Sequence, residues 1–133
     1  MNLGSAVSRV LSNGSAKHGV DHWWRQRVTA LALVPLSVWF GISLLLMSRL
    51  EYASLAHWIH HGWNAVLLVA LVLAIAQHSY LGVRVVVEDY VHAPGPRMVT
   101  LLVVQFAHVI IAVAGVFAIL KVSLGGTSLG GGT

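Results

Sequence analysis

Cysteine is absent from this sequence of 133 residues, and only four side chains are acidic. Without cysteine the chain cannot form a disulfide framework, bind a metal through thiolates or ligate an iron–sulfur cluster by itself. Charged residues make up only 9% of the sequence, whereas a soluble domain carries about a quarter. Hydrophobic residues make up 57%, and the mean hydropathy is +0.80. So much apolar surface requires an apolar surrounding, and the sequence therefore predicts an integral membrane protein.

The eight lysine and arginine residues give a net charge of +4 but form no basic stripe. They gather near the ends of apolar segments, which favours a role in membrane orientation and argues against nucleic acid as a partner. Residues 1–21 are polar and basic, without the apolar core of a signal peptide. We expect residues 1–27 to form a cytoplasmic arm and an interfacial segment. A transit peptide, which is also rich in serine and poor in acidic residues, stays an alternative.

Three apolar stretches are long enough to cross a bilayer as helices, at about residues 28–47, 65–87 and 98–120. They define a transmembrane domain at residues 28–124, followed by a Gly/Ser-rich tail at residues 125–133 that we expect to be flexible. Between the spans, residues 48–64 form a polar connection whose later part is expected to be helical. Residues 88–97 are expected to form a short loop, because two prolines and a glycine end any helix there.

The distribution of Lys and Arg predicts the orientation in the membrane. More basic residues lie on the side of the amino-terminal arm and the second loop than on the opposite side. The positive-inside rule therefore places the amino terminus and the second loop in the cytoplasm, or in the equivalent mitochondrial matrix.

An ionisable side chain inside a membrane span is energetically costly and so marks a candidate functional site. His78 lies about 15 Å from the end of the second span at helical rise. Gly82 follows four residues later on the same helix face, where it leaves room for a flat macrocycle beside the imidazole. The pattern is consistent with His78 as an axial ligand of a haem iron, and equally with a histidine that only hydrogen-bonds a neighbouring helix.

His108 in the third span lies at about the same depth as His78, because the two helices run antiparallel. An intrachain pair of haem ligands is geometrically allowed, but we favour a hydrogen bond between helices for His108. His57, His60 and His61 lie at the opposite interface, and their spacing indicates no metal site.

Polar residues at the cytoplasmic ends of the spans form further candidates. Asp89 and Tyr90 offer a carboxylate and a phenol that can hydrogen-bond a quinone and relay a proton. The plainer alternative is an interfacial tyrosine beside a solvated aspartate. Arg27 opens the first span on the same side, where it can pair with a haem propionate or act as a positive-inside anchor.

Two segments carry a resemblance to a known family. They are HWWRQRVTALALVPL at residues 22–36 and HSYLGVRVVVEDYVH at residues 78–92. Both resemble the hydrophobic membrane-anchor subunit of succinate dehydrogenase, which is also called succinate:quinone oxidoreductase or complex II. The most specific motif is a histidine, three residues, a glycine, six residues and an Asp-Tyr pair. The Arg-x-Thr-Ala of residues 27–30 is a weaker one.

The resemblance implies three transmembrane helices that pack with a second three-helix subunit, cytochrome b556, around one haem b. It implies His78 as one axial iron ligand, with the other supplied by the partner, and Arg27 and Gly82 in the haem environment. It implies Tyr90 and Asp89 beside a ubiquinone site. No catalytic residue is implied on this chain, because a flavoprotein subunit oxidises succinate and an iron–sulfur subunit passes the electrons on. Such an anchor would link the tricarboxylic acid cycle to the respiratory electron transport chain. The expected location is the bacterial inner (plasma) membrane, ahead of the mitochondrial inner membrane.

Three alternatives stay open. An anchor of the fumarate reductase type, or another quinone-reactive membrane cytochrome, would differ in haem count and in whether one chain supplies both ligands. A small transporter or channel subunit would use His78 and Asp89 to relay protons, although Asp89 lies at an interface. A non-redox membrane scaffold would need neither cofactor nor quinone. The resemblance leaves His22 unassigned relative to the haem.

Overall fold

The computed structural model describes residues 3–125, with side chains from residue 23 onward. In this stretch of the chain every regular element is an α-helix, so the predicted all-α fold is confirmed. The helices are α1 (Leu3–Leu45), α2 (Tyr52–His60), α3 (Gly62–Tyr90) and α4 (Pro94–Leu124). The predicted tail of residues 125–133 lies, apart from Gly125, outside the described residues.

Three helices are long and apolar enough to cross a membrane, as predicted. They are the Trp23–Leu45 part of α1, the whole of α3 and the whole of α4. With 29 and 31 residues, α3 and α4 measure about 43 and about 46 Å at helical rise, more than the roughly 30 Å of hydrocarbon in a bilayer. Their ends therefore reach into the headgroup layers.

The first helix begins earlier than expected, because α1 runs without a break from Leu3 to Leu45. The backbone of the predicted polar arm is thus helical from residue 3 onward. Polarity indicates exposure to water rather than backbone conformation, and residues 3–22 contain no proline that would end a helix before the span. Pro35 lies inside the span, where membrane helices tolerate it.

The connection between α3 and α4 is also shorter than predicted. The sequence suggested a loop over residues 88–97, but α3 continues to Tyr90 and α4 begins at Pro94. The prolines lie in the first turn of α4, where the missing N–H group costs no helical hydrogen bond and the fixed φ suits the helix. In the first connection, α2 confirms that the later part of residues 48–64 is helical.

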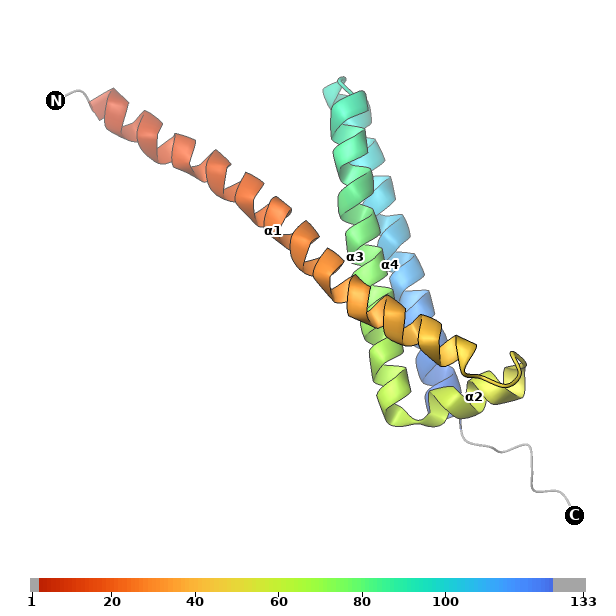
Figure 1. The fold of residues 1–133 in the computed structure, drawn as a ribbon. Helices are drawn as coiled ribbons and strands as arrows, with labels where there is room; N and C mark the ends of the chain where they lie inside the picture. Colours follow the sequence, from red (N-terminus) through yellow and green to blue (C-terminus); the bar gives the residue numbers. More distant parts are fainter. Residues whose placement is uncertain (1–2, 126–133) are drawn as a thin grey trace, which may run out of the picture.

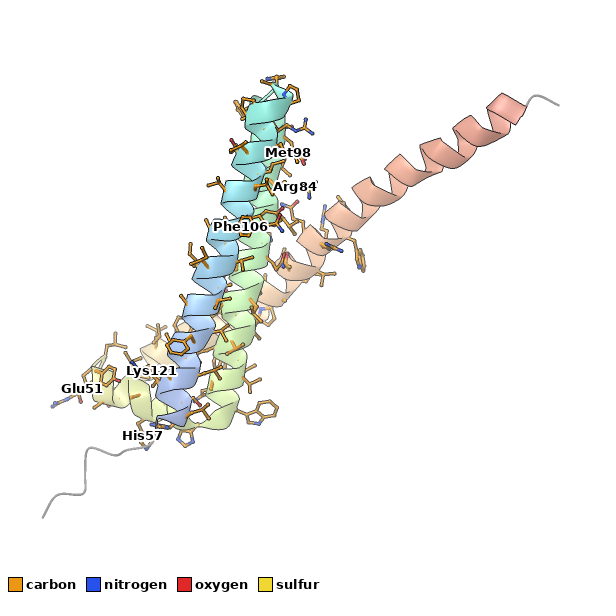
Figure 2. All side chains as sticks on the ribbon, turned by 180° about the vertical axis from the view of Figure 1, so that it is seen from behind. Glu51, His57, Arg84, Met98, Phe106 and Lys121 are labelled. Carbon is orange, nitrogen blue, oxygen red and sulfur yellow. The ribbon has the colours of Figure 1, made fainter. Side chains whose placement is uncertain are left out.

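The helix α3 occupies the centre of the fold, since it contacts each of the other three helices. Figure 1 shows α3 and α4 side by side and antiparallel, while α1 crosses α3 obliquely and diverges from it toward the amino terminus. The short α2 lies across the other end of the pair. Figure 2 places Glu51 and His57 at the end that holds Lys121, and Arg84 and Met98 toward the opposite end.

The packed core of the fold lies near α2. Ala65 and Leu68 of α3 and Ile119 of α4 are buried there. Trp39 and Trp58 pack against this cluster, and their two rings stack on each other with centroids 5.4 Å apart. Most other apolar side chains are exposed, including a stripe along α4 at helical spacing: Val99, Val103, Phe106, Ile110, Val113 and Phe117. Such a surface suits lipid tails or a partner subunit, not water.

Candidate functional site

His78 lies near the middle of α3, about 24 Å from its first residue and about 18 Å from its last. The side chain is partly buried. Its Nδ1 atom lies 3.2 Å from the hydroxyl oxygen of Thr29 in α1. The described residues offer no hydrogen bond to the other ring nitrogen, Nε2. The imidazole is therefore held at one nitrogen and has a nitrogen available at the other.

The face of α3 beside His78 carries no side chain at Gly82. A methyl group added to Gly82, one turn further along α3, would meet no atom within 4 Å. The neutral imidazole nitrogen is an ordinary ligand for haem iron. An imidazole with a free nitrogen beside an unfilled helix face fits a haem, whose flat ring needs both.

His108 makes the interhelical hydrogen bond favoured from the sequence. Its Nδ1 lies 2.7 Å from the carbonyl oxygen of Val104, which can only accept, so Nδ1 carries the proton. Its Nε2 then accepts the hydroxyl proton of Ser79 in α3 at 3.1 Å. Both ring nitrogens are engaged, and the ring meets Tyr80 edge-on with centroids 5.9 Å apart. His108 is therefore engaged within the chain at both ring nitrogens, whereas His78 is engaged at one.

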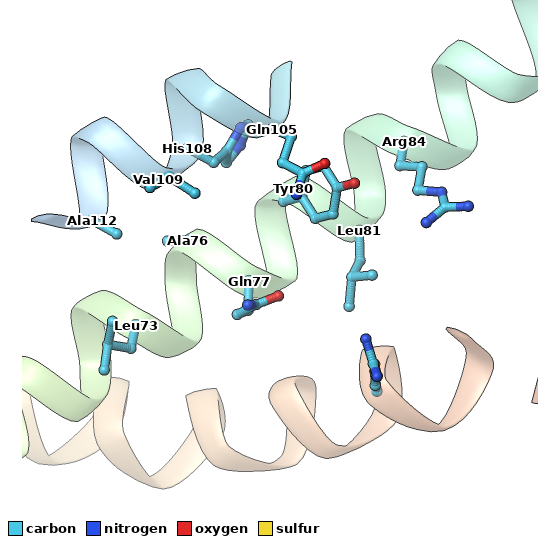
Figure 3. A pocket seen from close by; sticks show the side chains of 11 residues that line it. Leu73, Ala76, Gln77, Tyr80, Leu81, Arg84, Gln105, His108, Val109 and Ala112 are labelled. Atoms are coloured by element: carbon cyan, nitrogen blue, oxygen red, sulfur yellow. The ribbon is translucent and has the colours of Figure 1, made fainter. Parts of the chain in front are cut away.

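A polar cavity of about 580 Å³ lies between the helices on another face of α3, and it was not predicted from the sequence (Figure 3). The signal was present, because Gln77, Tyr80 and Arg84 recur at three- and four-residue spacing. Arg84 donates to the carboxylate of Glu88 one turn away at 2.8 Å. His78 is not among the lining residues, which are Arg25, Leu73, Ala76, Gln77, Tyr80, Leu81, Arg84, Gln105, His108, Val109 and Ala112.

Arg27 lies on α1 close to the start of its span and is exposed. Its guanidinium group sits over the ring of Trp23, 5.0 Å from the centroid. Two residues correspond to about 200° around a helix, so Arg27 and Thr29 occupy different faces of α1. The structure does not bring Arg27 toward His78.

Asp89 and Tyr90 are the last two residues of α3, and both are exposed, Tyr90 to 80%. Within residues 23–125 neither side chain has a hydrogen bond or an ion pair to another side chain. A carboxylate and a phenol are thus both exposed in the last turn of α3, about 100° apart around the helix, where an external ligand can reach them.

Of the remaining histidines, three lie at the other end (His57, His60 and His61), His92 is exposed in the connection between α3 and α4, and the side chain of His18 lies outside the described residues. His60 Nδ1 lies 3.1 Å from the backbone oxygen of Ser123, which ties α2 to the end of α4. Across the described residues, no group of three or more His, Asp or Glu side chains could hold a metal ion. The side chain of His22 is not described.

Comparison with known proteins agrees with this fold. Residues 1–120 match the model of a family described as the transmembrane subunit of succinate dehydrogenase and fumarate reductase. A succinate dehydrogenase hydrophobic membrane anchor subunit from Rickettsia conorii is 32% identical over 114 residues, which cover 85% of this chain and 90% of that protein. The proteins of the same name from Rickettsia typhi and Paracoccus denitrificans are 32% and 28% identical over 81% and 84% of this chain, and 86% of each of those proteins is covered. A match over nearly the whole chain, three helices able to span a membrane and a histidine in the central one lead to one conclusion: the chain belongs to the family of transmembrane subunits of succinate dehydrogenase and fumarate reductase.

Proposed function

We propose that this chain is the hydrophobic membrane-anchor subunit of a succinate dehydrogenase, which reduces ubiquinone with electrons from succinate. The observation that carries the proposal is the family match over residues 1–120. Relatives that are named as such anchors support it, because the match covers most of their own length. The anchor would link the tricarboxylic acid cycle to the respiratory electron transport chain. It would anchor the soluble subunits at the membrane and contribute side chains that bind the haem and the quinone, with no catalytic residue of its own.

In this function His78 would hold the iron of a haem b that is shared with a partner cytochrome b556 subunit. Three features support the assignment: the depth of His78 in α3, the free Nε2 atom and the open face at Gly82. A haem b held there would supply one-electron chemistry. Arg27 is the candidate partner of a propionate group, because its exposed guanidinium can leave the ring of Trp23 for a stronger, charge-assisted pair.

Asp89 and Tyr90 form part of the ubiquinone site in this proposal. Their exposure at the end of α3 supports the assignment, since a quinone headgroup can approach from the membrane interface. The phenol of Tyr90 donates a hydrogen bond to a quinone carbonyl oxygen. The carboxylate of Asp89 accepts and passes on a proton at the same place, because reduction of a quinone to a quinol requires two protons.

The exposed apolar surface supports the proposed partners. A three-helix chain that exposes large side chains along α1 and α4 has surface left for a second membrane subunit as well as for lipid. The iron–sulfur and flavoprotein subunits would bind on the cytoplasmic side, where the positive-inside rule places the α3–α4 connection. Relatives in Rickettsia and Paracoccus support a location in the bacterial inner membrane.

An anchor of the fumarate reductase type is the second candidate, because the description of the matched family names both enzymes. The same helices and the same haem and quinone chemistry serve either direction of electron flow. The relatives from Rickettsia and Paracoccus favour succinate oxidation, since each is named for succinate dehydrogenase.

The test is to purify the membrane complex through a tag on this chain and to measure ubiquinone reduction with succinate as electron donor. We expect flavin, iron–sulfur and b-type haem absorption in the purified sample, and quinone reduction that requires succinate. A complex that oxidises quinol with fumarate but does not reduce ubiquinone with succinate would favour the second candidate. A sample without flavin and without quinone activity would refute both.

A further inference from the structure

The hydroxyl group of Thr29 occupies the one place where the described side chains of α1 and α3 meet through a hydrogen bond. The Thr29 oxygen lies 3.2 Å from Nδ1 of His78, 2.9 Å from the backbone oxygen of Arg25 and 3.1 Å from that of Gln26. Three partners thus surround a group that has a single proton to donate.

The chemistry of these partners decides which way the protons point. Both backbone oxygens can only accept, and a threonine inside a helix commonly donates to the carbonyl three or four residues earlier. With its proton used there, the Thr29 oxygen offers lone pairs to His78, whose Nδ1 must then carry a proton. The neutral ring consequently has its lone pair on Nε2.

The opposite arrangement is unfavourable in this setting. If Thr29 donated to Nδ1, the proton of the neutral imidazole would lie on Nε2, which has no acceptor among the described residues. A donor without a partner in an apolar span is costly. A lone pair without a partner on the same atom is what a metal ion binds.

We propose that Thr29 is a positioning residue for His78: its hydroxyl oxygen accepts a hydrogen bond from Nδ1–H, fixes the tautomer and directs Nε2 toward the haem iron. This inference rests on the proposed function, in which His78 is an iron ligand. A histidine that binds a metal generally donates a hydrogen bond from its second ring N–H group to an acceptor. Loss of that acceptor weakens metal binding by about 10- to 100-fold. Because the acceptor comes from α1, the crossing of α1 and α3 sets the orientation of the ring.

The test uses the purified complex with Thr29→Val, which keeps the shape of the side chain but removes the hydroxyl group, and Thr29→Ser, which keeps it. Two properties are measured: the rate of haem transfer to excess apomyoglobin and the haem midpoint potential. For Thr29→Val we expect haem transfer about 10- to 100-fold faster and a higher potential, because a ligand without its acceptor donates less charge to ferric iron. For Thr29→Ser we expect both values to return toward those of the wild type.

Thr100→Val is the matched control. Thr100 in α4 donates to the backbone oxygen of Pro96 at 2.9 Å and has no histidine partner, so its loss removes the same kind of helix bond alone. We expect both haem properties to stay at the wild-type values. If Thr29→Val does not assemble, Thr29→Ala, which adds no bulk, decides by the same two measurements.

His78→Ala separates failure of this inference from failure of the proposed function. If that variant loses the haem spectrum while Thr29→Val behaves as the wild type, the role of Thr29 is refuted and the ligand assignment stands. If the haem properties change in Thr29→Val and do not return toward the wild-type values in Thr29→Ser, the effect comes from packing, and the role of Thr29 is also refuted. If His78→Ala keeps an unaltered haem, the ligand assignment fails, and the role of Thr29 fails with it.

Discussion

The Nε2 atom of His108 in α4 accepts a hydrogen bond from the hydroxyl group of Ser79 in α3 at 3.1 Å. Ser79 directly follows His78 in the sequence. Neighbouring residues on a helix point about 100° apart, so His78 and Ser79 serve different faces of α3. Two histidines at similar depth therefore have different roles: one joins two helices of this chain, and the other keeps a free nitrogen.

This difference predicts that the two histidines respond unlike each other to the same substitution. His78→Leu removes the proposed iron ligand, and we expect the reduced-minus-oxidised spectrum of the purified complex to lose its b-type bands. His108→Leu removes the hydrogen bond to Ser79 between the helices, worth about 1 kcal/mol, together with the bond to the Val104 backbone and the ring contact with Tyr80, but it removes no iron ligand in this proposal. We expect it to retain the haem spectrum at wild-type intensity. Loss of the haem in His108→Leu alone would contradict both assignments.

Tyr90→Phe is expected to impair quinone reduction without removing the haem, because it deletes one hydrogen bond and no iron ligand. A hydrogen bond to the substrate that contributes about 1.4 kcal/mol to transition-state binding corresponds to about a 10-fold reduction of kcat/KM when it is lost. The measurement is succinate-dependent ubiquinone reduction across quinone concentrations. Tyr52→Phe is the control, since Tyr52 is exposed to 77% at the start of α2 and far from Tyr90.

Asp89→Asn tests proton relay separately from hydrogen bonding. The amide keeps the size of the side chain and can still bond a quinone oxygen, but it cannot take up and release a proton at neutral pH. We therefore expect kcat to fall more than quinone affinity, and the loss to be largest at high pH, where protons from solvent are scarce. A variant with the pH profile of the wild type would argue that Asp89 is only a solvated residue.

Gly115→Ala is expected to loosen the packing of α3 against α4. A methyl group at Gly115 would lie 3.0 Å from Cγ1 of Val72, and a β-branched side chain can turn little to make room. We expect a cost of about 1–3 kcal/mol in the unfolding free energy of the detergent-solubilised chain, as for other overpacked sites. Gly41→Ala in α1 is the control, because its methyl group would meet no atom within 4 Å and alanine favours a helix. Equal stability of the two variants would show that the contact with Val72 is not close.

Trp58→Leu should separate α2 from α1, because the Trp58 ring stacks on Trp39 and also meets Phe40 with centroids 6.3 Å apart. Aromatic pairs contribute about 0.5–1.5 kcal/mol each beyond burial. Because two pairs are lost, we expect the free energy of unfolding, measured by heat or denaturant, to fall by about 1–3 kcal/mol. Trp63→Leu is the matched control, since Trp63 is 78% exposed. An unchanged stability for Trp58→Leu would indicate that the stack is not maintained in solution.

The three spans and the register of the candidate groups were predictable from the sequence, because both follow from local properties. A run of apolar residues must leave water wherever it lies in the chain. Helical spacing alone puts Gly82 one turn from His78 and puts both Asp89 and Tyr90 at the end of the span. The helical start at Leu3 and the brief α3–α4 connection were not predicted, because polarity identified residues 1–27 only as an arm and an interfacial segment, and the prolines suggested a loop over residues 88–97 where most of the backbone is helical.

Which polar groups meet was decided only by the tertiary structure. Thr29 and His78 are 49 residues apart, and His108 and Ser79 are 29 apart. Their contacts depend on how each helix is rotated and where it crosses its neighbour. Helical rotation and crossing are set by packing, such as Gly115 against Val72 and the aromatic stack beneath α3. The sequence by itself determined that the chain crosses a membrane with an imidazole inside it. The packing of the helices decided which imidazole is engaged within the chain and which keeps a nitrogen free, since a hydrogen bond requires its partners within about 3 Å.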